Sequence, residues 1–254
     1  RQMCIRDRDK LKSRIVIGEL GLDGAVIGVR GVLPAVLEAK KQGKIRHIAI
    51  TNHRLTVAHE AIDSGLYETL QFPFSYLAGE QEMELVRKCR AQQMGFIAMK
   101  GMAGGLIRDG FTAAAWMAQQ EGVVPIWGVQ REKELDEFLS YIENPPRMTD
   151  AIRAVIDHDR AELCGEFCRG CGYCMPCPAG IEINNCARMS LMLRRAPSEA
   201  QLTPQMQEKM KKIENCLHCN KCKSKCPYGL DTPTLLQKNY EDYKRVLAGE
   251  VSVK

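Results

Sequence analysis

Short apolar runs rich in branched residues recur along the first half of the chain. They lie at residues 45–51, 69–72, 96–99 and 123–127, and their centres are about 23 to 27 residues apart. Because the runs do not alternate strictly between apolar and polar positions, they are expected to be buried on both faces, which is typical of a parallel sheet covered by helices. The pattern predicts consecutive strand–helix units.

Segments with helical periodicity separate the strands, at residues 33–42, 57–64, 80–94, 112–120 and 132–142. Gly43 and Gly95 follow the first and third of them, where many helices end on a left-handed residue. Thr56 precedes the second and is expected to cap it. Asn144, Pro145 and Pro146 end the last one, so we expect a boundary there, followed by a charged connecting helix at residues 151–163.

Four strand–helix units do not close a barrel. A (β/α)8 barrel takes about 250 residues for eight units, whereas the four units here take roughly 100 residues and leave two open sheet edges. The first residues, RQMCIRDRDK, are charged and aperiodic, and they are typical of a leader that is not native to the protein. Both observations predict that the chain is a fragment.

The composition is that of an ordinary globular protein, with 45% hydrophobic and 26% charged residues. No window approaches the roughly 20 apolar residues of a membrane helix, and the leader has no secretory apolar region, so a cytoplasmic protein without a membrane partner is expected. The formal charge is +5. Since no basic stripe is interleaved with aromatic residues, nucleic acid is not expected as a partner.

Ten of the twelve cysteines lie between Cys164 and Cys226. Eight of them form two rows, CRGCGYCMPCP and CLHCNKCKSKCP, the second of which follows the CxxCxxCxxxCP pattern in full. In two-cluster ferredoxins three thiolates of such a row bind one [4Fe-4S] cluster, and the cysteine before proline binds the other. We therefore predict two clusters, one held by Cys168, Cys171, Cys174 and Cys226 and the other by Cys216, Cys219, Cys222 and Cys177.

Other uses of these cysteines remain open at this stage. Structural zinc sites also use CxxC pairs, although usually as two separated pairs, and disulfides are not expected in a reducing compartment. Cys164 and Cys186 lie outside both rows and are either buried thiols or substitute ligands. Helical patterns at residues 183–195 and 204–215 indicate a mainly helical ferredoxin type. The lysines between residues 209 and 225 either compensate the negative charge of the clusters or form a docking face for an acidic electron carrier.

Four segments together resemble the iron-sulfur-containing branch of the aldo/keto reductases: GKIRHIAITNH, TLQFPFSYL, MGFIAMKGMAGG and CRGCGYCMPCPAGI. The resemblance covers about residues 30–245. It implies the C-terminal half of a (β/α)8 TIM barrel at residues 11–146 after a leader at 1–10, a connecting helix at 147–163 and a two-cluster ferredoxin-type domain at 164–254. It also implies that the strands are the fifth to eighth of the barrel and that a nicotinamide cofactor lies across their C-terminal ends.

The same resemblance implies roles for individual residues. Thr51, Asn52 and Gln71 match residues that hold the nicotinamide carboxamide, and Met99 stands where many members have a stacking aromatic residue. Further cofactor positions follow the last strand, namely Gly128, Gln130 and Arg131 for the phosphates and Glu134 and Glu137 for the adenine, with Phe138 in place of a common asparagine. From the residues alone, Thr51 and Asn52 are also typical of a strand end, and Gln71 of backbone pairing.

The resemblance implies an oxidoreductase that couples NAD(P)-linked carbonyl or alcohol chemistry to electron transfer through two [4Fe-4S] clusters. Its partners would be a small carbonyl substrate and a redox carrier such as ferredoxin or flavodoxin. The family's catalytic Asp, Tyr, Lys and His come from the first four strands, so the catalytic residues are unknown here and this chain alone is expected to be inactive. The alternative is a ferredoxin-like electron-transfer protein with the barrel remnant as scaffold.

Overall fold

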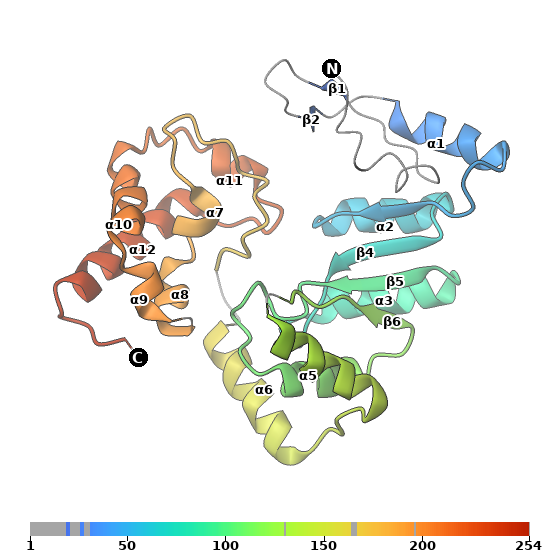
Figure 1. Cartoon of the computed structure of the whole chain (residues 1–254). Coiled ribbons are helices and arrows are strands. Elements are labelled where there is room, and N and C mark those ends of the chain that lie inside the picture. The colour runs from blue at the N-terminus through green and yellow to red at the C-terminus, as the bar shows by residue number, and fades with distance from the viewer. Residues whose placement is uncertain are drawn as a thin grey trace.

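The structure is a computed structural model, and it describes residues 19–20, 26–27, 31–129, 131–163, 167–195 and 197–253. A sheet with helices forms the first part of the chain and a group of helices forms the second (Figure 1). Strands β1 (Glu19–Leu20) and β2 (Val26–Ile27) pair antiparallel with each other and form a separate small sheet. The expected leader at residues 1–10 lies outside the described residues.

The main sheet is parallel, with the strand order β3 (Ala49–Thr51), β4 (Thr69–Pro73), β5 (Gly95–Met99) and β6 (Val123–Pro125). The four strands predicted from the apolar runs are therefore present, in sequential order. Strand β3 begins at Ala49, four residues later than predicted. The carbonyl of the preceding Ile48 still accepts the Glu68 N–H at 2.8 Å, but its own N–H donates to the Glu68 carboxylate at 2.5 Å.

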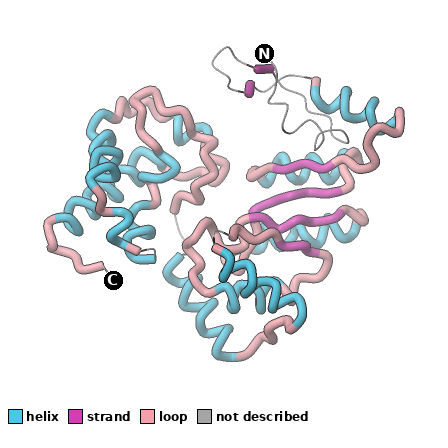
Figure 2. Tube along the Cα trace, in the orientation of Figure 1, coloured by secondary structure: helices cyan, strands magenta, loops and turns pink. Residues whose placement is uncertain are grey.

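Helices α2 (Leu55–Ser64), α3 (Glu80–Ala91) and α4 (Gly110–Met117) connect consecutive strands of the sheet, whereas α1 (Val32–Lys41) precedes β3 and α5 (Glu132–Glu143) follows β6 (Figure 2). Gly43 has the expected left-handed backbone after α1, with φ of 69°. The predicted cap Thr56 is wrong, because α2 already begins at Leu55 and the N–H of Arg54 is bound by the Asn52 side chain at 3.1 Å.

The prediction that Gly95 ends the third helix is also wrong. Helix α3 ends at Ala91, the left-handed residue after it is Gln93 with φ of 54°, and Gly95 is the first residue of β5. Gly95 is needed there for close packing, since a Cβ atom would lie 2.7 Å from Cγ2 of Thr69 on the neighbouring strand.

Aromatic side chains on the sheet form the centre of the first core. Phe74 packs against Phe96 and Trp116, with ring centroids 5.4 and 5.2 Å apart. Helix α6 (Asp150–Leu163), which follows the predicted Pro-rich boundary, adds Ile152 and Ile156 to the same core. The helix that joins the two parts of the chain is therefore packed against the first core, next to α4.

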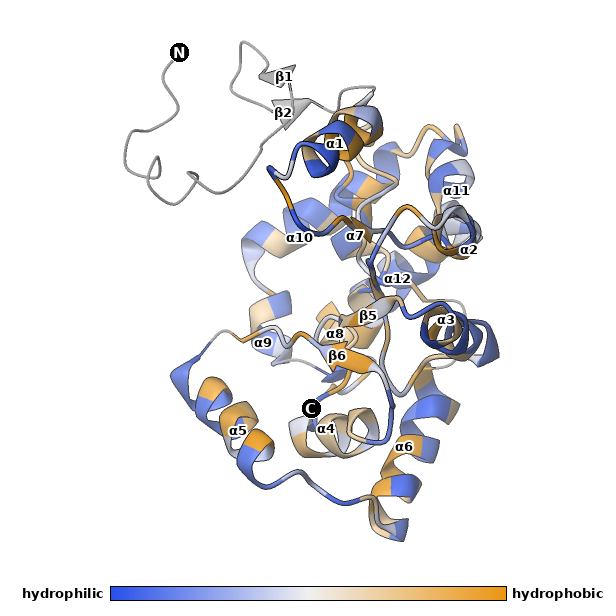
Figure 3. Cartoon of the chain, turned by 90° about the vertical axis from the view of Figure 1, so that its right-hand side faces the viewer, coloured by the Kyte–Doolittle hydropathy of each residue, from blue (hydrophilic) through white to orange (hydrophobic). Residues whose placement is uncertain are grey.

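The outer side of the barrel segment is less well covered. Val124 of β6 is 62% exposed and Ile142 of α5 is 75% exposed. In Figure 3, hydrophobic positions on α5 lie beside hydrophilic ones. No helix in the described part of the chain is long and apolar enough to cross a membrane.

Every regular element among the described residues of the second part is a helix, and residues 167–182 form an irregular segment before the first of them. It contains α7 (Ile183–Cys186), α8 (Met189–Arg195), α9 (Ser198–Gln201), α10 (Pro204–Lys211), the 3-10 helix η2 (Lys212–Asn215), α11 (Lys221–Lys225) and α12 (Thr232–Leu247). The predicted helix at 183–195 is broken into α7 and α8. Helix α12, which the sequence analysis did not anticipate, packs Leu236 and Tyr243 into the second core.

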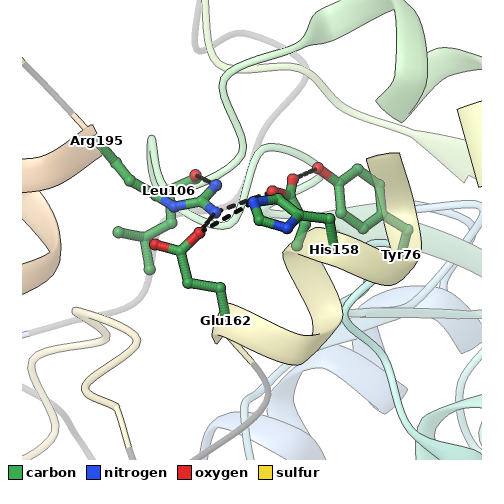
Figure 4. Close-up of polar contacts among 6 residues, drawn as sticks. Tyr76, Leu106, His158, Glu162 and Arg195 are labelled. Atoms are coloured by element: carbon green, nitrogen blue, oxygen red, sulfur yellow. Dashed lines mark hydrogen bonds and ion pairs between the residues drawn. The ribbon is translucent and has the colours of Figure 1, made fainter. Parts of the chain in front are cut away.

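A buried arginine joins the two parts. Arg195, which is 9% exposed, donates to the Leu106 carbonyl at 3.1 Å and to the Asp159 carboxylate at 2.9 Å, and it also pairs with Glu162 (Figure 4). The other oxygen of Asp159 accepts a hydrogen bond from the Tyr76 hydroxyl. Because Leu106 and Tyr76 belong to the first part of the chain, this network holds α8 of the second, helical part against it.

Replacing Arg195→Leu is expected to destabilise the protein by about 3–5 kcal/mol, because Asp159 is left buried without its ionic partner. Urea unfolding followed by circular dichroism measures the loss. The double variant Arg195→Leu with Asp159→Leu should recover part of it, since neither charge is then left alone.

Arg153→Leu is the matched control, because Arg153 is exposed and makes only a 3.8 Å contact with Asp150. Its effect should stay within about 0.5 kcal/mol. Equal losses for the two single variants would contradict the structural role given to Arg195.

Candidate functional site

The C-terminal ends of the strands bring three of the sequence-predicted cofactor residues into one row. Thr51 at the end of β3 is in register with Gln71 on β4, and the N–H of Asn52 donates to the Gln71 carbonyl at 3.2 Å. The Gln71 side chain reaches the next strand, where its amide lies 3.6 Å from the sulfur of Met99. The fold therefore places Asn52, Gln71 and Met99 across neighbouring strands at the same edge.

Asn52 has an unsatisfied donor at this edge. The residue is 6% exposed, its Oδ1 accepts from Arg54, and its Nδ2 is buried with no hydrogen-bond partner among the described residues. A buried amide N–H without a partner costs free energy, so such a group is a candidate for binding an acceptor on a ligand. A carboxamide oxygen fits this donor.

The residues predicted for the cofactor phosphates lie after β6. Gly128 and Arg131 are exposed, and Gln130 lies outside the described residues. The Arg131 guanidinium is engaged by Glu134 at 2.8 Å, and Glu137 accepts from Tyr141 at 2.6 Å. Phe138, which stands where relatives have asparagine, stacks on Trp127 with ring centroids 4.6 Å apart.

The first cysteine row and the last cysteine of the second row come together. Cys168 interacts electrostatically with both Cys171 and Cys226, and Cys174 interacts with Cys168 and Cys171. Burial raises the pKa of the Cys168 thiol, and it raises that of Cys174 to about 12. These are the members predicted for one cluster.

Gly170 allows the tight loop around Cys168. Its N–H donates to the Cys168 sulfur at 3.4 Å, and its φ of 66° is left-handed. A Cβ atom at this position would lie 2.7 Å from the guanidinium of Arg188, which itself donates to the Gly104 carbonyl at 2.6 Å.

The members predicted for the other cluster line one apolar hollow. Its walls include Ile181, Ile183 and Leu236 together with the cysteines, and the lining thiols are those of Cys174, Cys177, Cys216, Cys219 and Cys222. Cys222 also interacts electrostatically with Cys216 and Cys219, and burial raises its pKa. A thiol-lined apolar hollow fits an iron-sulfur cluster, whose inorganic core is held by thiolates in a largely dry environment.

The remaining cysteines have different surroundings. Cys186 is fully buried in the second core with its sulfur 3.8 Å from the Lys209 carbonyl, and burial raises its pKa to about 11. Cys164 lies outside the described residues. Among the described residues, no group of three or more His, Cys, Asp and Glu side chains is arranged to hold a single metal ion.

The strand ends face the first cysteine row. His53, the residue after Asn52, packs edge-on against Tyr173 with ring centroids 5.4 Å apart, and the Arg54 guanidinium lies 5.6 Å from the same ring. Tyr173 stands between Cys171 and Cys174. Tyr173 was not predicted as a functional residue, although its position as an aromatic residue within a cysteine row could have indicated such a role.

Residues 29–113 match the aldo/keto reductase family, and residues 167–231 match the 4Fe-4S dicluster domain. A solved structure assigned as a 2,5-diketo-D-gluconic acid reductase B is 21% identical, with a TM-score of 0.39, over 50% of this chain and 50% of that one. The chain thus spans about half the length of that structure. No curated protein matches the chain significantly.

The two family matches agree with the resemblance inferred from the sequence motifs, and their order along the chain is the predicted one. One segment of the chain is thus similar to the aldo/keto reductase family, and a later segment is similar to the 4Fe-4S dicluster domain.

Proposed function

We propose that this chain is the cofactor-binding and electron-transfer part of an aldo/keto reductase-type oxidoreductase. The proposed reaction interconverts a small carbonyl compound and its alcohol with NAD(P) and is coupled to two [4Fe-4S] clusters. The observation that carries the proposal is the edge-on packing of the His53 and Tyr173 rings, whose centroids are 5.4 Å apart. It joins the residue beside the candidate nicotinamide ligand Asn52 to the candidate cluster ligands Cys171 and Cys174.

At the strand ends, the chain's own residues would bind and orient the cofactor. The free Nδ2 of Asn52 would donate to the carboxamide, and Gln71 would bind the same group after releasing its weak contact with Met99. Thr51 would complete this part of the site, and Gly128, Gln130 and Arg131 would receive the phosphates. A bound nicotinamide supplies or accepts a hydride, and the clusters carry single electrons.

In the cluster domain we assign one cluster to Cys168, Cys171, Cys174 and Cys226 and the other to Cys216, Cys219, Cys222 and Cys177. The electrostatic coupling of Cys168 with Cys226 supports the crossed arrangement, and so does the position of Cys177 in the hollow of the second row. Cys174 also borders that hollow, so the two sites adjoin. Adjacent clusters would allow electrons to pass from one to the other.

A second candidate function is electron transfer alone, with the barrel segment as scaffold. The pairing of Arg131 with Glu134 favours it, because this guanidinium would have to leave the carboxylate to bind a phosphate. A ferredoxin or flavodoxin would then exchange electrons at the lysine-rich surface of α10 and α11. Binding of NAD(P)H separates the two candidates, since only the first requires it.

Reconstitution without oxygen tests the cluster content. The protein should bind about eight iron and eight sulfide and show a broad absorbance near 400 nm that bleaches on reduction. Stoichiometric zinc without sulfide would instead mean that the cysteines form zinc sites.

The crossed ligation predicts which cluster each variant loses. Cys226→Ala should impair the cluster of the first row, whereas Cys177→Ala should impair the cluster of the second row. Electron paramagnetic resonance of the reduced protein, with iron analysis, distinguishes the two spectra. Cys186→Ala is the control and should keep about eight iron, because Cys186 is assigned to no cluster. Loss of the cluster that belongs to the same row as the replaced cysteine would show that each row binds its own cluster.

Asn52→Ala and Gln71→Ala should each weaken the binding of NADH or NADPH to this chain by about 2- to 12-fold, which corresponds to a net hydrogen bond of about 0.5–1.5 kcal/mol. Cofactor fluorescence measures the dissociation constants. Asn144→Ala and Gln119→Ala are matched controls away from the strand ends and should leave them unchanged. If the controls and the site variants behave alike, the assignment of the nicotinamide site is wrong.

A further inference from the structure

A pocket lies between the strand ends and the cluster domain, next to the proposed nicotinamide site. Its barrel side is formed by residues after β3, β4 and β5, including His53 and Lys100, and its cluster-domain side by Phe167, Arg169 and Tyr228. Neither Asn52 nor Gln71 lines it. The pocket is therefore a separate place, to which both parts of the chain contribute.

Two cations face this pocket without an acidic partner among the described residues. The Arg169 guanidinium lies over the rings of Phe167 and Tyr228, 4.7 and 4.4 Å from their centroids, and it forms no ion pair with another residue that the structure describes. Aromatic faces hold a guanidinium in place while its N–H edge stays open to an anion. Lys100 forms no ion pair with another described residue. Glu82 also lines the pocket, and its carboxylate keeps its charge while it accepts the N–H of Gly79 at 3.0 Å.

Neutral polar groups in the wall are also unsatisfied. Both ring nitrogens of His53 and the hydroxyl of Tyr228 are buried, and none has a hydrogen-bond partner among the residues that the structure describes. Buried polar groups are normally paired, so several unpaired ones around one pocket point to a ligand that completes them.

The backbone at Lys100 is strained. Its φ of 61° is left-handed, which is uncommon for a residue other than glycine, asparagine or aspartate. It directly follows the last residue of β5, Met99. Strained conformations of this kind cluster at ligand sites because the surrounding structure holds a side chain where it is used.

Size and polarity limit the ligand. The cavity volume is about 60 Å³, and at about 10–15 Å³ for each water this is room for roughly four to six waters or an organic molecule of similar extent. Phe72, Phe74 and Phe167 also line the pocket and supply apolar surface, and the Phe167 ring lies against the Arg169 guanidinium. The pocket therefore suits a molecule with a short apolar body and one anionic end.

We infer that this pocket binds a small aliphatic carboxylate. The carboxylate is received by the Arg169 guanidinium and the Lys100 ammonium, with hydrogen bonds from the Tyr228 hydroxyl and an N–H of His53, and the carbon chain packs on the phenylalanines. The site goes beyond the proposed function. It needs neither a nicotinamide nor turnover, so its failure is distinguishable from failure of the redox proposal.

Equilibrium dialysis of the reconstituted protein with radiolabelled isobutyrate tests the inference, and isobutyramide is the uncharged molecule of the same shape. Isobutyrate should bind at one site per chain, and isobutyramide should bind at least tenfold more weakly because it lacks the charge. Inorganic phosphate offers the same anionic oxygens without an apolar body, and it should also compete at least tenfold more weakly. Equal binding of acid and amide, or tighter binding of phosphate, would overturn the assignment.

Lys100→Gln and Arg169→Gln should each weaken isobutyrate binding at least fivefold. Arg153→Gln removes an exposed charge far from the pocket in sequence and is the control, with an expected change below twofold. Arg169 is next to Cys168, so iron content is measured for each variant, and Lys100→Gln provides a test outside the cysteine rows. Unchanged affinity in a Lys100→Gln protein with full iron content would refute the site.

Discussion

The buried ion pair between Arg195 and Asp159 determines how the two parts of the chain face each other. Asp159 belongs to α6, which also buries Ile152 and Ile156 in the barrel core, whereas Arg195 is the last residue of α8 in the cluster domain. A buried charge is tolerated only when it is paired and hydrogen-bonded, so this geometry is narrowly defined. The contacts of Tyr173 with the strand end depend on the same orientation.

The parallel sheet supplies a second constraint. In a parallel sheet all strands end at the same edge, and the loops that follow them are the usual place for ligand-binding residues. The parallel arrangement alone therefore brings Asn52, Lys100 and the loop after β4 to the same edge of the sheet. The cluster domain needs to cover only this edge to contact all of them, and Tyr173 and Arg169 do so.

Much of the fold could be predicted from the sequence because the determining features are local. Apolar runs identified the strands of the sheet, and cysteine spacing identified both rows of thiols. Local patterns were less reliable at element ends. Gly95 was read as a helix end although packing against Thr69 requires it in a strand, and α12 was missed although Leu236, Tyr240 and Tyr243 have helical spacing.

The parts that could not be predicted depend on contacts between residues distant in sequence. Arg195 was an ordinary charged residue until its position against Leu106 and Asp159 was known. The same holds for Arg169 and Tyr228, which come together only after the second cysteine row has folded back on the first. The resemblance to a family directed attention to Asn52, but its unsatisfied amide could be seen only in the structure.

The proximity of Cys226 to Cys168 has a consequence for the unfolded chain. A cluster that binds cysteines from both rows acts as a covalent cross-link that closes a loop on the order of 60 residues. For a single disulfide that closes a loop of this length, the lost entropy of the denatured state raises its free energy by about 4 kcal/mol at 25 °C. Two crossed clusters would enclose α7, α8, α9 and α10 within nested loops. These short helices could then persist in a domain whose apolar core is small, because the ligands restrict the alternatives open to the chain.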